Sequence, residues 1–371
     1  MSAGLKIEYN RLMKRFFILA LIILIGAFII LHVVRAKVRQ DIDQPVYQPA
    51  LTPAPTVTID RLQNTNTSLF VPNWTLDSIT DSFDQYIYFG ITPTKEGINA
   101  TASGTKDSKT FLKDIPHGKR KLLALEMQNT DVNAAILQNK TLQLKVISQT
   151  VSMAKANGFS GIVLNLEMGG IPFSSLIDEI NSFTQALNAQ AKAYQLQLAV
   201  TLYGDTFYRM RPFDVKHIAA NSDSIMIMAY DFHKARSNPG PNFPLGGQNM
   251  YGYDIGKMSD DFLQVVPNLK LNVIFGLFGY DWPVDIQGNA VGQGQPLTNL
   301  QIQNKFLNNC SFQDCQIKRD TISAETVIHY TDKDKQKHIV WFEDTQSVMT
   351  KEQYLRKRGI GNFSFWANSY F

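Results

Sequence analysis

From about Ile59 onward, the chain alternates short runs rich in β-branched and aromatic residues with longer amphipathic stretches. This alternation predicts parallel strands that are joined by crossover helices. The expected strands are 68–74, 85–91, 121–127, 161–167, 196–203, 224–230, 271–277 and 362–366. Eight such units predict an α/β fold, a closed (β/α)8 barrel that occupies residues 61–371.

A longer stretch, at about 283–340, separates the seventh expected strand from the eighth. It contains a helical pattern at 297–307 and strand-like runs at 326–330 and 338–341, which predict a small α+β insertion on the barrel rim. The two cysteines of the chain, Cys310 and Cys315, lie within it. We expect them to form a disulfide in an oxidising compartment, with two free thiols as the alternative.

The N-terminal part has a different character, because every residue from Phe16 to Val34 except His32 is apolar. As a helix, this stretch would be roughly 28 Å long, close to the ~30 Å of a bilayer core. We therefore expect one transmembrane anchor at 16–34. A cytoplasmic tail at 1–15 would precede it, a Pro-rich linker at 35–60 would follow it, and the barrel would lie outside the cytoplasm. A signal peptide cleaved after Ala36 is the alternative.

The charge pattern excludes some classes of function. The 36 Lys and Arg residues against 32 Asp and Glu residues give a net charge of +4, which is too small and too scattered for a nucleic-acid surface. The six His residues form no cluster with metal-ligand spacing, so no metal and no other cofactor is expected.

The fourth expected strand has two different faces. Ile162, Leu164 and Leu166 form one apolar face, whereas the other face ends in Asn165 and Glu167. Active sites of such barrels lie at the C-terminal ends of the strands, so these two side chains should project together into a cleft. A solvent-exposed strand end without function is the alternative.

Four stretches at expected strand ends carry a more specific pattern. They are 158–167 with its terminal Glu167, Met228-Ala229-Tyr230-Asp231, 275–282 with Tyr280 and Trp282, and 363–366 with Trp366. In order and spacing they resemble the strand motifs of glycoside hydrolase family 18, whose fold is a TIM barrel. The segment Trp341-Phe342-Glu343-Asp344, with Ser347 and Lys351 after it, is similar to the branch that acts on bacterial cell walls and spore cortex.

The resemblance implies roles for individual residues. The nucleophile would be the acetamido carbonyl oxygen of the substrate, and Glu167 would be the acid and then the base. Asn165 would hold the acetamide N–H, and Tyr230 would donate its hydroxyl group to the acetamide oxygen. Asp231 would bind a sugar hydroxyl, and Trp366 would form an apolar floor under the ring.

Four further residues, Met228, Tyr280, Trp282 and Trp74, are expected around the substrate. Simple packing is the alternative for the aromatic residues of the site, and helix capping is the alternative for Asp231.

The chain departs from the family at three positions that are usually aspartate and are here Ser160, Val163 and Asn165. A carboxylate at 165 would stabilise a cationic intermediate, which an amide does not do, so reduced activity is expected. The resemblance implies a glycosidase that cleaves β-linked N-acetylhexosamine glycans, such as peptidoglycan, chitin-like polymers or N-glycans, by a retaining mechanism. A non-catalytic glycan-binding barrel and an envelope scaffold are the alternatives.

Overall fold

The computed structural model describes residues 67–169 and 173–371. The expected anchor, its cytoplasmic tail and the linker lie outside these residues. No helix within the two described ranges has both the length and the apolar character that crossing a membrane requires.

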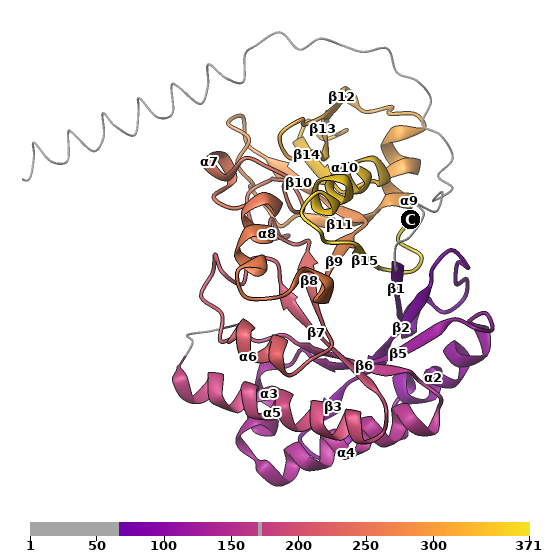
Figure 1. Ribbon diagram of the computed structural model, residues 1–371. Helices are drawn as coiled ribbons and strands as arrows, with labels where there is room; N and C mark the ends of the chain where they lie inside the picture. Colours follow the sequence, from indigo (N-terminus) through magenta and orange to yellow (C-terminus); the bar gives the residue numbers. More distant parts are fainter. Residues whose placement is uncertain (1–66, 170–172) are drawn as a thin grey trace, which may run out of the picture. The chain divides into compact units, whose positions relative to one another are not determined.

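Eight parallel strands form a closed barrel (Figure 1), in the order β1-β15-β9-β8-β7-β6-β5-β2. The strands are β1 (Thr67–Pro72), β2 (Gln85–Ile91), β5 (Arg120–Met127), β6 (Gly161–Leu166), β7 (Gln197–Tyr203), β8 (Ser224–Ala229), β9 (Leu271–Gly276) and β15 (Asn362–Trp366). The ring closes where β1 pairs with β15, with Thr67 opposite Phe363. All eight expected strands are confirmed, each within two residues of its predicted bounds.

Helices connect the strands on the outside of the barrel. They are α2 (Ser103–Asp114), α3 (Thr130–Gln138), α4 (Lys140–Ala156), α5 (Ser174–Ala193), α6 (Val215–Ala220), α7 (Gln248–Tyr251), α8 (Ile255–Leu263) and α10 (Thr345–Arg356), with short 3-10 turns at Asn73–Thr75 and Asn268–Lys270. A two-stranded ribbon of β3 (Pro93–Thr94) and β4 (Gly97–Ile98) precedes α2. Several helices begin at a side chain that accepts a backbone N–H, as Asn129 does for α3 and Asp254 for α8.

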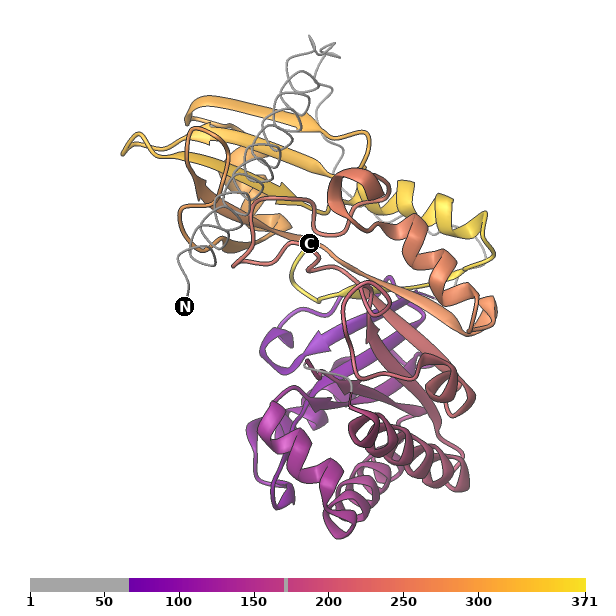
Figure 2. The ribbon, with the colours of Figure 1, turned by 90° about the vertical axis from the view of Figure 1, so that its left-hand side faces the viewer.

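The insertion is a five-stranded antiparallel sheet in the order β11-β10-β14-β13-β12, seen in orange and yellow in Figure 2. Its elements are β10 (Phe278–Val284), β11 (Gln295–Thr298), α9 (Asn299–Ile302), a π-helical turn (Gln303–Leu307), β12 (Gln313–Arg319), β13 (Thr326–Thr331) and β14 (Lys337–Phe342). Cys310 and Cys315 form a disulfide at the start of β12, with 6.3 Å between their Cα atoms. The sheet begins at Phe278 rather than near 283, because β10 follows β9 after a single residue, Leu277.

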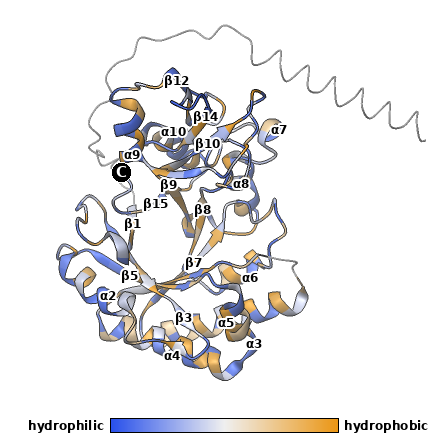
Figure 3. Ribbon diagram, turned by 180° about the vertical axis from the view of Figure 1, so that it is seen from behind, coloured by the Kyte–Doolittle hydropathy of each residue, from blue (hydrophilic) through white to orange (hydrophobic). Residues whose placement is uncertain are grey.

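Apolar side chains fill the barrel on both sides of its strands. Val163, Ala199 and Met226 belong to a small cluster inside the ring, whereas Ile162 and Leu164 belong to the larger core under the helices. Figure 3 shows strands β7 and β8 as mostly hydrophobic and helices α4 and α5 as two-coloured, as expected of amphipathic helices around a buried sheet. The alternation predicted for β6 is therefore present, and its inner face leads to Asn165 and Glu167.

Candidate active site

A cleft of about 410 Å³ opens at the C-terminal ends of the barrel strands. The barrel contributes Phe70, Phe89, Gln128, Asn165, Glu167, Thr201, Tyr203, Gly204, Asp205, Met228, Tyr230, Asp231, Lys234, Ile274, Trp366 and Tyr370, and the insertion contributes Phe278, Tyr280, Pro296, Leu297, Thr298 and Gln301. The volume and the mixture of aromatic and polar side chains are typical of a small-molecule or oligosaccharide site.

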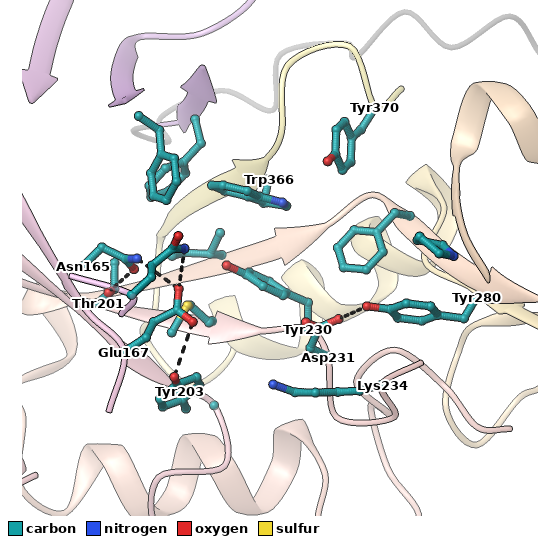
Figure 4. Close-up of a pocket in the computed structure, with 18 of the residues that line it drawn as sticks. Asn165, Glu167, Thr201, Tyr203, Tyr230, Asp231, Lys234, Tyr280, Trp366 and Tyr370 are labelled. Carbon is teal, nitrogen blue, oxygen red and sulfur yellow. Dashed lines mark hydrogen bonds between the residues drawn. The ribbon is translucent and has the colours of Figure 1, made fainter. Parts of the chain in front are cut away.

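Glu167 follows β6 directly and lies in a ring of hydrogen-bond donors (Figure 4). Its Oε1 accepts from Gln128 Nε2 at 2.9 Å and from Asn165 Nδ2 at 3.0 Å, and its Oε2 accepts from the hydroxyl group of Tyr203 at 3.4 Å. Thr201 donates to Asn165 Oδ1 at 2.7 Å. The Asn165 amide is thus held with its N–H toward Glu167.

Two tyrosine hydroxyl groups near Glu167 remain protonated at physiological pH. Burial, together with the charges of Glu167 and Asp231, raises the pKa of Tyr230 well above its ordinary value. Burial and the charge of Glu167 also raise the pKa of Tyr203. Both hydroxyl groups can therefore donate hydrogen bonds to a ligand or to Glu167.

Asp231 follows β8 in a left-handed conformation with a φ of 58°. Its backbone N–H donates to Asn242 Oδ1 at 2.7 Å, and its Oδ1 accepts from the hydroxyl group of Tyr280 at 2.8 Å. Burial raises the pKa of Asp231, although Tyr280 and the positive charge of Lys234 oppose the change. Asp231 is a cleft residue that joins the barrel to the insertion, and it caps no helix.

Aromatic rings form one wall of the cleft. Trp366, at the end of β15, lies edge-on to Phe89 at 4.8 Å between ring centroids and tilted against Phe70 at 5.6 Å. The ring of Tyr230 is nearly parallel to that of Trp366, with an angle of 21° and 6.5 Å between centroids. Figure 4 shows Glu167, Tyr230 and Trp366 around one common space, where a sugar ring could stack on the indole.

A buried ionic network is connected to Asp231 through hydrogen bonds. Lys351 on α10 forms ion pairs with Glu325 and Glu343, and all three side chains are fully buried. Glu325 accepts the backbone N–H groups of Asn242 at 2.6 Å and Phe243 at 2.8 Å. Since Asn242 in turn accepts from the backbone of Asp231, the Glu343 to Lys351 segment helps to position a cleft residue.

Seven of the nine predicted site residues outside the disulfide line the cleft. They are Glu167, Asn165, Tyr230, Asp231, Trp366, Met228 and Tyr280. Trp282 does not line it, because its side chain is fully buried on β10. Trp74 is 59 % exposed beside the cleft residue Phe89 and does not line the cleft either.

Several lining residues were not expected from the sequence, above all Gln128, Thr201 and Tyr203. They lie at or near the C-terminal ends of β5 and β7. The rule that located Glu167, a polar side chain at the end of a strand, could have located them as well. No cluster of three or more His, Cys, Asp or Glu side chains that could hold a metal ion occurs in the described parts of the chain.

Comparison with known proteins identifies the family of the barrel. The family model of glycosyl hydrolases family 18 matches residues 130–370. The chain belongs to glycoside hydrolase family 18. The match covers the strands β6, β7, β8, β9 and β15 and the insertion, and so includes Glu167, Tyr230 and Trp366.

The chain is similar to proteins of two Bacillus species. A Bacillus subtilis protein named as a sporulation-specific glycosylase, YdhD, is 25% identical over 241 residues, which are 64% of this chain and 54% of that protein. A cortical fragment-lytic enzyme of Bacillus anthracis is 22% identical over 249 residues, 64% of this chain and 53% of that enzyme. The chain thus spans only about half of the length of these two curated relatives.

Solved structures share the fold. The spore cortex-lytic enzyme SleL of Bacillus cereus has a TM-score of 0.66 at 18% identity, over 83% of this chain and 71% of that one. A family 18 chitinase of Cycas revoluta, solved in complex with (GlcNAc)3, has a TM-score of 0.69 at 21% identity, over 82% of this chain and 95% of that one.

Proposed function

We propose that this protein is a glycosidase that cleaves β-linked N-acetylhexosamine glycans with Glu167 as its acid and base. The proposal rests on the groups that surround the side chain of Glu167. The carboxyl group of Glu167 lies in the cleft with three hydrogen-bond donors around it, together with a protonated Tyr230 and the indole of Trp366. Family membership supports the same chemistry.

The proposed reaction needs a single carboxyl group. The acetamido oxygen of the bound sugar attacks C1 while the glycosidic C1–O bond breaks, and Glu167 gives its proton to the leaving oxygen. The resulting oxazolinium ion is positively charged. Glu167 then takes a proton from the water that attacks C1, so that the acetamide is restored and the configuration at C1 is retained.

The other cleft residues would position the acetamido group. Tyr230 would donate its hydroxyl group to the acetamide oxygen. Asn165 Oδ1 accepts one hydrogen bond from Thr201, and its second lone pair is able to accept the acetamide N–H. Asp231, held by Tyr280 and Asn242, would bind a sugar hydroxyl group. These roles account for side chains that point toward one space (Figure 4).

We propose bacterial cell-wall glycan as the substrate, ahead of chitin. The names of the relatives from spore-forming bacteria support this order. We also propose that the barrel lies outside the cytoplasmic membrane, where this glycan is found. The disulfide between Cys310 and Cys315, which is typical of an oxidising compartment, supports that location.

The test uses the 371-residue chain with muropeptides and with chitooligosaccharides, and identifies the products by mass spectrometry. We expect cleavage next to an N-acetylhexosamine. Glu167→Gln should reduce turnover by about 10²–10⁴-fold while binding is retained, because the amide fills the same space without a proton to donate. Cleavage by Glu167→Gln at the parent rate would exclude the mechanism.

A non-catalytic glycan-binding barrel is the second candidate, and the observation that favours it is Asn165 in place of an aspartate. Such a protein would bind N-acetylated glycans through Trp366 and Tyr230 without cleaving them. Binding by both the parent and Glu167→Gln, with no product from either, would support this candidate.

A further inference from the structure

Glu126 is a buried carboxyl group that the reaction proposed above does not use. It lies near the end of β5 and is only 5% exposed. Its Oε2 accepts a long hydrogen bond of 3.4 Å from Thr92, and its Oε1 has no hydrogen-bond partner among the described residues. A buried carboxyl group with one free oxygen costs folding free energy, so its presence calls for a reason.

The strand register places Glu126 next to the catalytic strand. In the parallel pairing of β5 with β6, Glu126 is the partner of Asn165, and Ala124 is the partner of Val163. Ala124 and Val163 both belong to the cluster inside the barrel, and Glu126 lies two residues after Ala124, so its side chain has the same inward direction. The side chain of Glu126 therefore points into the barrel beside Asn165, although Glu126 does not line the cleft itself.

Glu126 also interacts electrostatically with the site. Burial, opposed by the hydrogen bonds from Thr92 and the backbone of Ile91, raises the pKa of Glu126 to about 7, and the charge of Glu167 adds to the rise. The titratable groups that act on it from neighbouring strands are Glu167, after β6, and Tyr88, on β2. No ion pair of Glu126 occurs in the described part of the chain, so its negative charge is not neutralised.

We propose that Glu126, from β5, stabilises the positive charge that forms on the bound sugar. This inference rests on the proposed glycosidase function. With Val163 and Asn165 in place of the usual aspartates, β6 itself carries no acidic residue, and Glu167 directly after it is the acid. Glu126 supplies a negative charge from the adjacent strand instead. It forms no bond to the substrate, and the apolar interior of the barrel screens its field little.

The kinetic test compares Glu126→Gln with the parent as a function of pH. Because only ionised Glu126 carries the charge, the ratio of parent kcat to variant kcat should rise from about 1 below pH 5.5 to about tenfold above pH 8. The complete pH profile of each protein is measured, because replacing Glu126 also removes its electrostatic interaction with Glu167. The control is Glu96→Gln. Glu96 is an exposed glutamate in the connection between β2 and β5, and its variant should give a flat ratio near 1.

A binding test needs no turnover. The basic iminosugar 2-acetamido-1,2-dideoxynojirimycin, which is a cation when its ring nitrogen is protonated, should bind Glu126→Gln about tenfold more weakly than the parent at pH 7. The neutral trimer of N-acetylglucosamine should bind both within about twofold, which also shows that the variant is folded. Adding Asn165→Asp to Glu126→Gln should restore most of the lost kcat, because the acid then lies on β6.

The outcomes separate the two proposals. If the parent cleaves a glycan and the kcat ratio is flat across pH, the role of Glu126 is excluded and the glycosidase function stands. If the parent neither cleaves nor binds any N-acetylated glycan, both proposals fail. Equal loss of affinity for the charged and the neutral ligand would assign Glu126 a purely structural role and would overturn the inference.

Discussion

Asn165 illustrates how a single amide can be held in one orientation at the centre of a site. Thr201 occupies its oxygen, and its N–H donates to Glu167 Oε1 at 3.0 Å. In Asn165→Asp, a carboxyl group replaces the N–H donor. Two carboxyl groups at this distance share a proton, and the added negative charge stabilises a cation. We expect kcat on N-acetylated substrates to rise roughly tenfold, which corresponds to about 1.4 kcal/mol.

Steady-state kinetics of Asn165→Asp and Asn165→Ala measure this effect. The alanine variant, which lacks both polar groups, should be slower than the parent. A kcat for Asn165→Asp below that of the parent would show that the amide itself is required.

Glu126 should also be visible in the stability of the fold. Its pKa in the folded protein, about 7, lies above the ordinary value of 4.5. The folded state therefore binds this proton more tightly than the unfolded state does. The associated stabilisation is complete below about pH 4.5 and is lost as the pH rises through 7. This rise of the pKa from 4.5 to about 7 corresponds to about 3 kcal/mol.

Glu126→Gln removes this titration. We expect the variant and the parent to have similar free energies of unfolding at pH 4.5, with the variant more stable by up to about 3 kcal/mol at pH 8. Urea unfolding at both pH values measures the difference, with Glu96→Gln as the exposed control. A difference between variant and parent that does not change with pH would contradict the expectation.

Among the elements, helix α10 is linked to the site indirectly, from Lys351 through Glu325 and Asn242 to Asp231. Lys351 forms ion pairs with two buried carboxyl groups, those of Glu325 and Glu343. Burial lowers the pKa of Lys351, but Glu325 and Glu343 outweigh this effect and raise it. Lys351→Met leaves both glutamates without a cation, and we expect a loss of about 3–5 kcal/mol in the free energy of unfolding. Lys357→Met, at an exposed position just after the same helix, should change it by less than about 0.5 kcal/mol.

Thermal or urea unfolding of the two lysine variants tests this prediction. If Lys351→Met still folds, its affinity for the trimer of N-acetylglucosamine should also fall, because Glu325 orders the Asn242 backbone that holds Asp231. Equal stability of both variants would mean that the ionic network contributes nothing to the fold.

Elements differ in how far the sequence predicts them. The barrel strands follow from short-range alternation, which a few residues suffice to reveal. The start of the insertion cannot be predicted in this way, because Leu277 and Phe278 continue the apolar run of β9 into β10. Strand β12 was not expected either, since Gln313–Arg319 is an edge strand with mostly polar residues.

The same limit applies to the site. Glu167, Tyr230 and Trp366 lie at the ends of recognisable strands and were expected, whereas Thr201 and Glu126 matter only through neighbours on other strands. The pairing of Glu126 with Asn165 depends on the register of two strands, and that register is set by the closure of the whole barrel. Pattern within a single segment carries no information on it.

At the scale of the whole molecule, the proposed location of the barrel outside the cytoplasmic membrane depends on the N-terminal segment. We expect the mature protein to retain Phe16 to Val34, because this stretch is longer than the apolar core of an ordinary signal peptide. Mass spectrometry of the intact protein from membranes measures its N-terminus, and protease added to spheroplasts should cleave the barrel. A mature N-terminus at Lys37, or a barrel protected from protease, would contradict an outward-facing anchored protein.

The pairing of Glu126 with Asn165 also bears on how such a centre can change during evolution. When two paired residues on neighbouring strands both face the barrel interior, substitutions can move a charged side chain from one strand to the other while the backbone stays unchanged. A search based on the β6 motif alone would group this chain with proteins that lack the aspartate at position 165. Among homologues, we expect an acidic residue at position 126 to occur together with asparagine at 165, and an uncharged residue at 126 wherever 165 is aspartate.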